Sequence, residues 1–234
     1  MTDYPESTAR FTRETAAHEM TVLHEDGLYR HLVFTDPTGS FYRFDLITWP
    51  HNLFLRGDGF SFGFSIYPTK DIFDMFRGSS GGGINPGYWQ EKVTAGKVQD
   101  WSEETFRAWA LDEAVKAESR FPGAVEAVTK QILHSDEYST EYRGTAEYAV
   151  AAFSHGEFRL RFPNDWEEDF EDYSWEYLFA CHAVLFGIDK WDVSRKAERP
   201  TPQHFDKVPD PLDGCHWCAC GNRWPCKHAK AVAA

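Results

Sequence analysis

Four cysteines and two histidines lie within fourteen consecutive residues near the end of the chain: Cys215, His216, Cys218, Cys220, Cys226 and His228. Zinc prefers thiolate and imidazole ligands, and ligands one to five residues apart converge on one ion through a tight turn. Only five cysteines occur in the 234 residues, so this concentration predicts a metal site. The expected ligands of one Zn²⁺ are Cys218, Cys220, Cys226 and His228.

Other arrangements of the same thiols stay open. The four thiols could instead form two disulfides. Against this, Cys218 and Cys220 are too close together to bridge easily, and His228 would then have no role. Cys215 is a candidate substitute ligand, or it lies with His216 around the ligands and orients them. Otherwise Cys215 is a spare thiol and His216 a surface residue. Four protein ligands leave no position for a substrate, so we expect a structural zinc that folds the tail.

The order Cys-x-Cys, five residues, Cys-x-His resembles the SWIM-type zinc finger over about residues 214–230. The five-residue gap is at the short end of that family's range. The resemblance implies one structural zinc on the four ligands named above. It also implies a role in binding DNA or protein, without choosing between these partners.

A second metal pattern suggests an enzyme. His155-Gly156-Glu157, followed by Cys215 and Cys218, is similar to the ligand pattern of zinc-dependent nucleobase deaminases. The first cysteine lacks the proline of that signature, the gap of about sixty residues is long, and His155 precedes a predicted strand rather than opening a helix. We assign no catalytic residue, and we expect the fifth cysteine, Cys181, to be a buried structural thiol.

Residues 164–173 concentrate acidic side chains around three aromatic rings. One interpretation is a solvent-exposed loop and helix start, anchored to the core by its aromatic rings. The other is a surface that imitates the charge of nucleic acid and binds a basic site on another protein. The candidate partner-binding residues are Trp166, Glu167, Glu168, Asp169, Glu171 and Asp172.

The charge is distributed unevenly along the chain. The net charge is −13; residues 100–188 hold 7 basic against 19 acidic side chains, and residues 189–234 hold 8 against 6. Nucleic acid repels an acidic surface, because its affinity for proteins depends largely on Lys and Arg neutralising phosphates. We therefore expect that only the weakly basic tail can contact a phosphate backbone.

The first half of the chain has the pattern of strands. Aromatic and β-branched runs alternate with short Gly-containing turns, which predicts an antiparallel meander with strands at 28–35, 41–49, 53–56 and 60–67. A short helix capped by Thr69 is expected at 70–77. The glycine-rich segment 78–87 lacks the Lys and Ser or Thr of a phosphate-binding loop, so we expect a surface loop there.

The second half is expected to be mainly helical. The pattern predicts helices from Asp100 or Ser102 to about 119, and at 123–134, 141–154 and 172–186. The alternating run 158–162 predicts a strand that returns to the sheet. The fold class is therefore α+β, with an N-terminal antiparallel β-meander packed with a mainly helical second half, plus a small zinc-stabilised tail.

The same pattern sets the domain boundaries. We expect an N-terminal arm at 1–27, an α+β body at 28–199, a Pro-rich connector at 200–213 and a zinc knuckle at 214–234. The first twenty residues are charged and no apolar run approaches eighteen residues. We therefore expect a cytoplasmic protein that is neither secreted nor membrane-spanning and has no membrane partner, which also suits reduced thiols.

The N-terminal half carries a second resemblance. Residues 44–50, the run 60–66, the helix at 71–77 and the sequence Ile-Asn-Pro-Gly-Tyr-Trp at 84–89 are similar to uncharacterised proteins encoded by tailed bacteriophages. The similarity covers about the first 100 residues. It implies a setting, the cytoplasm of an infected bacterium, and no activity or site residues.

One principal hypothesis and two alternatives follow. The principal hypothesis is a non-enzymatic zinc-binding accessory protein that binds a macromolecule, first of all a host protein. The alternative is a nucleic-acid-binding accessory factor that acts through the basic zinc tail. The third is a zinc-dependent nucleotide-modifying enzyme. The sequence leaves the oligomeric state open.

Overall fold

The computed structural model describes residues 4–39, 41–163 and 170–198. The chain divides into two units between Gly187 and Ile188, a boundary that falls within helix α8 (Trp175–Glu198). In the described part of the second unit, the last turns of α8, the guanidinium of Arg195 lies 4.1 Å from the centre of the Trp191 ring. All other described elements belong to the first unit.

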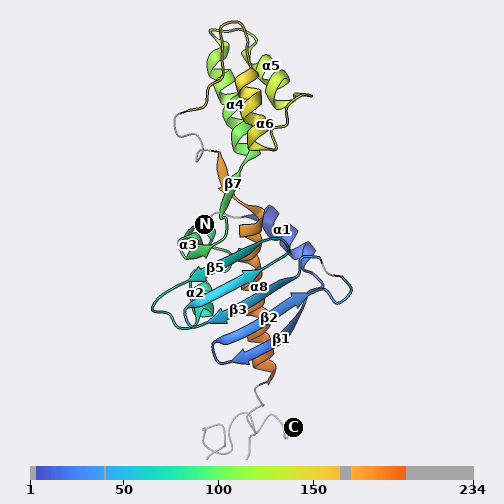
Figure 1. Ribbon diagram of the computed structural model, residues 1–234, viewed down its shortest axis with the longest axis vertical. Coiled ribbons are helices and arrows are strands. Elements are labelled where there is room, and N and C mark those ends of the chain that lie inside the picture. The colour runs from blue at the N-terminus through green and yellow to red at the C-terminus, as the bar shows by residue number, and fades with distance from the viewer. Residues whose placement is uncertain (1–3, 40, 164–169, 199–234) are drawn as a thin grey trace, which may run out of the picture. The chain divides into compact units, whose positions relative to one another are not determined.

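The first unit contains a six-stranded antiparallel sheet in which each strand pairs with the next one in the chain (Figure 1). Its strands are β1 (Glu19–Asp26), β2 (Tyr29–Thr35), β3 (Phe44–Trp49), β4 (Asn52–Arg56), β5 (Ser61–Ser65) and β6 (Val93–Ala95). The predicted meander is confirmed, and with the helical second half it confirms the α+β class.

One face of the sheet is covered by helices. Its inward side chains are almost completely buried and come from alternate positions of the strands, as the two-residue period requires: Leu32, Phe34, Phe44, Leu46, Leu53, Leu55, Phe62 and Phe64. The first half of α8 packs on this face, with the Phe179 ring centre 5.9 Å from that of Phe44. The other helices on it are α1 (Pro5–Glu14), α2 (Ile72–Ser79) and α3 (Pro86–Gln90).

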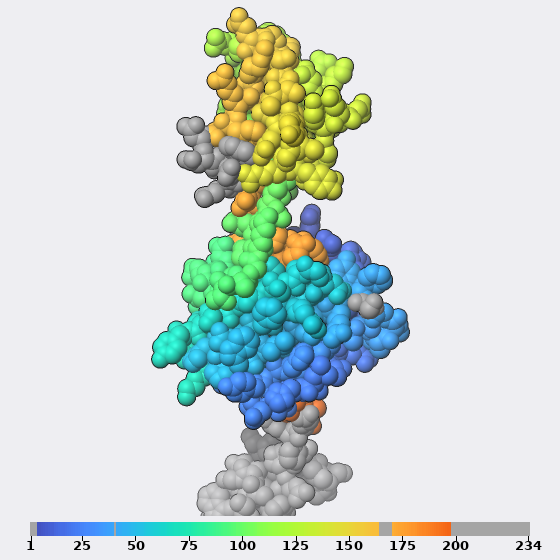
Figure 2. Space-filling model, in the orientation of Figure 1, coloured from blue at the N-terminus to red at the C-terminus, as the bar shows by residue number. Residues whose placement is uncertain are grey.

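The opposite face of the sheet has no described helix over it, and Figure 2 shows the side chains of β1 to β5 forming its surface. Side chains on this face, such as Ile47 and Phe54, are only partly buried, and Trp49 is 40% exposed. This alternation between buried and part-exposed positions is typical of an antiparallel sheet covered on one side.

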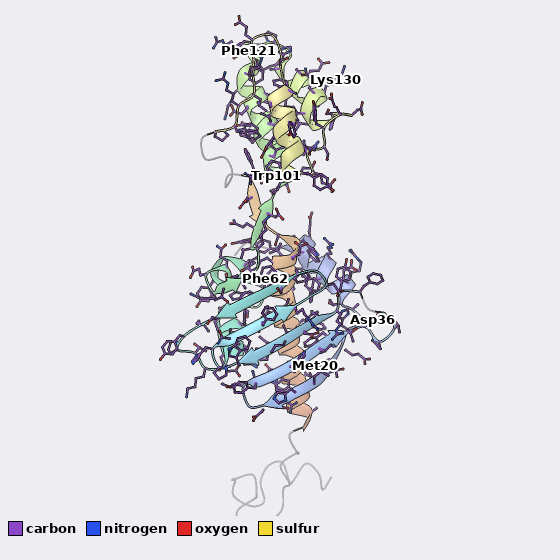
Figure 3. All side chains as sticks on the ribbon, viewed as in Figure 1. Met20, Asp36, Phe62, Trp101, Phe121 and Lys130 are labelled. Atoms are coloured by element: carbon purple, nitrogen blue, oxygen red, sulfur yellow. The ribbon has the colours of Figure 1, made fainter. Side chains whose placement is uncertain are left out.

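A two-stranded ribbon connects this layer to a separate group of helices. The ribbon pairs β7 (Gln99–Trp101) with β8 (Glu171–Tyr173). Between them in the chain lie α4 (Glu103–Glu118), α5 (Ala124–Val128), the π-helical turn η1 (Thr129–Leu133) and α6 (Arg143–Ala152). These helices bury a core of their own that includes Phe106, Val128 and Ile132. Figure 3 shows Trp101 at the junction of ribbon and helices.

Several local predictions differ from the structure. The predicted strand at 158–162 is wrong, because the backbone there forms only an isolated bridge between His155 and Phe158; the sheet gains β6 instead. The last helix begins at Trp175 rather than at 172, because residues 171–173 pair with β7. The expected arm 1–27 contains α1 and the edge strand β1, whose side chains are mostly exposed and therefore lack an apolar pattern.

Candidate functional site

The ribbon places two carboxylates directly opposite each other. Asp100 on β7 pairs in register with Asp172 on β8. Side chains opposite each other in an antiparallel pair lie on the same face with their Cβ atoms about 5 Å apart, and like charges at such a position destabilise the pair. The sequence therefore holds two negative charges together where sheet stability alone favours a neutral or oppositely charged pair.

Each of the two carboxylates is fixed by a hydrogen bond to the next peptide group. The backbone N–H of Trp101 donates to Asp100 over 2.7 Å, and that of Tyr173 donates to Asp172 over 2.7 Å. Asp100 also accepts a bond from Lys97 over 2.6 Å. This bond, with the amide bond, holds the pKa of Asp100 below its usual range although partial burial opposes the shift. Both side chains stay exposed.

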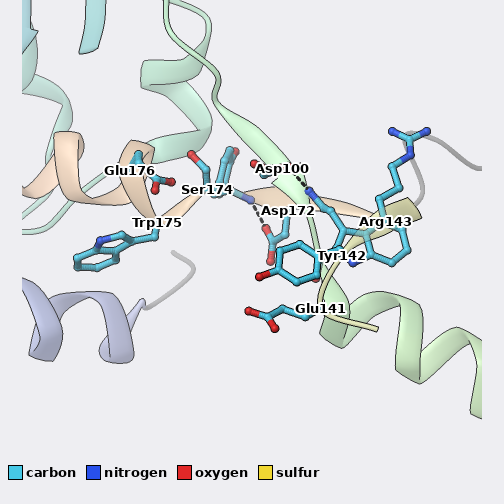
Figure 4. Close-up of a pocket in the computed structure, with 11 residues that line it drawn as sticks. Asp100, Glu141, Tyr142, Arg143, Asp172, Ser174, Trp175 and Glu176 are labelled. Carbon is cyan, nitrogen blue, oxygen red and sulfur yellow. Dashed lines mark hydrogen bonds between the residues drawn. The ribbon is translucent and has the colours of Figure 1, made fainter. Parts of the chain in front are cut away.

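The two aspartates line a pocket of about 510 Å³ that also receives side chains from the segment before α6. The indole N–H of Trp101 donates to the carbonyl of Thr140 over 3.0 Å and so ties this segment to the ribbon. Next in the chain are Glu141 and Tyr142, which is 63% exposed. In Figure 4 the Tyr142 ring lies beside Asp172.

The start of α8 forms another wall of the pocket. Ser174 is 8% exposed and caps the helix, because its hydroxyl accepts from the N–H of Tyr177 over 3.1 Å. Glu176 lies in the first helical turn, where the helix dipole favours a carboxylate. The ring of Trp175 points toward α1, and the guanidinium of Arg10 lies 3.8 Å from its centre.

The lining of the pocket is net negative. Four acidic residues line it (Asp100, Glu141, Asp172 and Glu176) against one basic residue, Arg143. Lys97, outside the lining, neutralises part of this charge by its ion pair with Asp100. Arg143 donates to Glu147 on its own helix over 3.2 Å. Carboxylates beside aromatic rings attract ammonium and guanidinium groups by charge and by cation–π interaction. The pocket is therefore suited to a basic side chain or another organic cation.

The structure places part of the acidic segment at this pocket. Asp172 lines it and Glu171 lies next to it on β8, paired with Trp101. Sequence reasoning missed Asp100, Glu141 and Tyr142, which lie 30 to 72 residues away from Asp172 in the chain. Other predicted residues lie outside the described part of the chain: Trp166, Glu167, Glu168, Asp169, and in the tail Cys215, His216, Cys218, Cys220, Cys226 and His228.

The residues considered for an enzyme are engaged in structural contacts. His155 Nε2 lies 2.9 Å from the carbonyl oxygen of Pro122, and Glu157 lies in the turn that follows. Cys181 is fully buried, which confirms the expectation for it, and burial raises the pKa of its thiol. The imidazole of the neighbouring His182 points away from Cys181 and toward Ser7, and its Nε2 lies 3.0 Å from Ser7 Oγ. Within the described ranges, no three His, Cys, Asp or Glu side chains are grouped to hold a metal ion.

Comparisons with protein-family models, with curated proteins and with solved structures gave no match for this chain. None of the helices described is both long and apolar enough to cross a membrane.

Proposed function

We propose that the protein is a non-enzymatic zinc-binding accessory protein that acts by binding another protein. The observation that carries the proposal is the facing pair Asp100 and Asp172 in an acidic, aromatic-lined pocket. A Lys or Arg side chain of a partner would relieve the repulsion between them, and this relief would contribute to binding. The pocket would thus be a receptor for a basic segment.

The zinc would serve the tail. Three thiolates and one imidazole from Cys218, Cys220, Cys226 and His228 form a closed donor set, which favours a structural ion that orders residues 214–234. The similarity of the first 100 residues to phage proteins favours the cytoplasm of an infected bacterium as the setting and a host protein as the partner. The net charge of −13 is consistent with a basic partner.

The proposal predicts opposite effects of one substitution on stability and on binding. In Asp172→Asn the new amide oxygen still accepts the bond from Tyr173, while the charge facing Asp100 is removed. We expect the free energy of unfolding to rise by about 0.2–1 kcal/mol, and binding to a hexa-arginine peptide to weaken at least about fivefold. A residue kept only for the fold would not give this combination.

The binding experiment uses isothermal titration of the full, zinc-loaded chain at low and at physiological salt. Asp112→Asn is the matched control, because Asp112 is an exposed aspartate on α4 paired with Lys116. We expect its affinity for the peptide to equal that of the wild type. Equal affinities of the wild type and Asp172→Asn would refute the pocket as the binding site.

The partner itself is identified by capture from host lysate with three baits: wild type, Asp172→Asn and Asp112→Asn. A protein bound by the first and third baits, and lost from the second, would support the proposal. Salt-sensitive binding of DNA or RNA that requires the tail would instead favour the alternative, a nucleic-acid accessory factor.

A further inference from the structure

The open face of the sheet contains a second charged group that shares no residue with the acidic pocket. Asp45 on β3 is 1% exposed. It alternates with the inward Phe44 and Leu46 and so lies on the opposite face, which no described helix covers. Its Oδ2 accepts from Arg56 Nη2 over 2.7 Å and lies 3.0 Å from His31 Nε2. Its Oδ1 accepts from Arg43 Nε over 3.3 Å.

The sheet register brings these four residues together. Arg56 on β4 is directly opposite Asp45. Arg43 lies just before β3 and reaches the Asp45 carboxylate with its Nε–H. His31 pairs with Ile47, the next residue of β3 on this face. Side chains from β2, from β4 and from the residue before β3 therefore converge on the Asp45 carboxylate.

A buried carboxylate at this position is costly to the fold unless it is paired. Its neighbour on β2, Val33, is 6% exposed and packs there as an apolar residue. An apolar side chain at 45 would fill the same place without the desolvation of a charge. What Asp45 adds is orientation, because it holds two guanidinium groups side by side at the surface.

The two arginines retain most of their hydrogen-bonding capacity. A guanidinium has five N–H donors, and Arg43 and Arg56 each donate to Asp45 alone among the described residues. Their side chains are 45% and 58% exposed, so solvent and ligands reach them. Two positive charges against one carboxylate make this site locally positive on a chain of net charge −13. Guanidinium pairs of this kind bind oxyanions through parallel N–H bonds.

We propose that Arg43 and Arg56, which Asp45 holds in position, form a receptor for a single carboxylate of a bound polypeptide. The surface beside it is apolar, because the next cross-strand pair on the same face is Ile47 with Phe54. Residues 19–65 contain 3 basic and 6 acidic side chains, which disfavours the chain of phosphates in nucleic acid. An Asp or Glu followed by apolar residues fits this surface. The preference of this site for a carboxylate is argued from these contacts alone. That the carboxylate belongs to a protein partner rests on the proposed function.

The test follows the Nε–H resonances of Arg43 and Arg56 by NMR in the full ¹⁵N-labelled chain. Four probes are compared: an acetylated hexapeptide of alternating Glu and Leu, the same peptide with Gln for Glu, a ten-nucleotide oligothymidylate and inorganic phosphate. We expect the Glu peptide to shift both resonances and the Gln peptide to shift neither. We expect Arg56→Gln to lower the affinity for the Glu peptide by about tenfold or more, because charged hydrogen bonds to the carboxylate are lost.

Two further variants separate binding from folding. Arg56→Lys keeps the charge near Asp45 and removes the planar fork, and we expect an intermediate loss of affinity. Arg161→Gln removes an exposed arginine of the helical group and is expected to change nothing. Amide spectra of each variant report whether the sheet is intact.

Three results would overturn the inference. They are unchanged arginine resonances at 10 mM Glu peptide, equal effects of Glu and Gln peptides, and tighter binding of oligothymidylate or phosphate than of the Glu peptide. A failure of the acidic pocket to bind hexa-arginine would leave this test unaffected, because Asp100 and Asp172 play no part in it.

Discussion

Arg30 on β2 and Asp71 at the start of α2 form a two-pronged ion pair. The Nη1–Oδ1 distance is 3.0 Å and the Nη2–Oδ2 distance is 2.7 Å. Asp71 also caps α2 by accepting from the N–H of Phe73 over 3.1 Å. Partial burial opposes ionisation, but the bonds from Arg30 and Phe73 prevail and hold the pKa of Asp71 below its usual range. The pair fastens α2 to the sheet.

Replacing Asp71 by alanine is expected to lower the free energy of unfolding by about 2–4 kcal/mol, because Arg30, 7% exposed, would lose its carboxylate partner and α2 its cap. Urea unfolding followed by circular dichroism measures this. The control is Asp74→Ala on the same helix, where the carboxylate is 66% exposed and pairs with Arg77. A loss below about 0.5 kcal/mol is expected there. Equal losses in the two variants would contradict the role given to the ion pair.

Gly187 on α8 is expected to be intolerant of any side chain. A Cβ atom there would collide with Leu46 of β3 and approach Phe34 Cζ to 3.1 Å. Gly187→Ala should therefore lower the free energy of unfolding by about 1–3 kcal/mol, although alanine favours the helix by about 1 kcal/mol. Gly78→Ala in α2, where a Cβ meets no atom within 4 Å, should be neutral or stabilising by thermal unfolding. A stabilised Gly187→Ala variant would show that α8 packs less closely on the sheet.

His182 is expected to make stability fall in mild acid. Burial lowers its pKa to about 4, against about 6.5 in an unfolded chain. Between these values the unfolded state binds more protons, so stability is complete above pH 6.5 and is lost as the pH falls toward 4. We expect this residue to account for about 1–2 kcal/mol, after allowance for its partial exposure.

The measurement compares urea unfolding of wild type and His182→Gln from pH 7.5 to 4.5, since the chain has ten histidines and only the difference isolates this one. The stability advantage of the wild type should be constant above about pH 6.5 and should shrink as the pH falls from there to 4.5. A constant difference would mean that His182 titrates normally in the folded protein.

The tail is expected to bind about one zinc per chain. Elemental analysis of the purified, untagged protein should find this metal, and Cys226→Ser should lose it, because one of four ligands is removed. The described residues of the first unit bury a core without the tail, so we expect thermal melting of the sheet unit to be unchanged in the variant. If the wild-type protein contains no zinc, the predicted metal site is refuted. If Cys226→Ser also lowers the melting temperature of the sheet unit, the division into body, connector and knuckle is contradicted.

The sequence was sufficient to predict the α+β class and strands β2 to β5 of the meander. Alternation of apolar residues in β2 to β5 is a local signal, and so are the turn residues between these strands. Ser102 was one of two predicted caps of α4, and its hydroxyl accepts from the N–H of Thr105 over 3.2 Å. The six potential zinc ligands in fourteen residues are likewise a local pattern, and their metal stays a prediction.

Long-range pairing could not be predicted. Strands β7 and β8 have three residues each and lie 69 residues apart in the chain, so nothing in the local sequence pairs Asp100 with Asp172. The same holds for Asp45, which reads as a solvent-exposed residue of an open face until the register places Arg43, Arg56 and His31 around it. Local periodicity determined which residues face the core, whereas strand register decided which charges meet, because register depends on the packing of the whole sheet and ribbon.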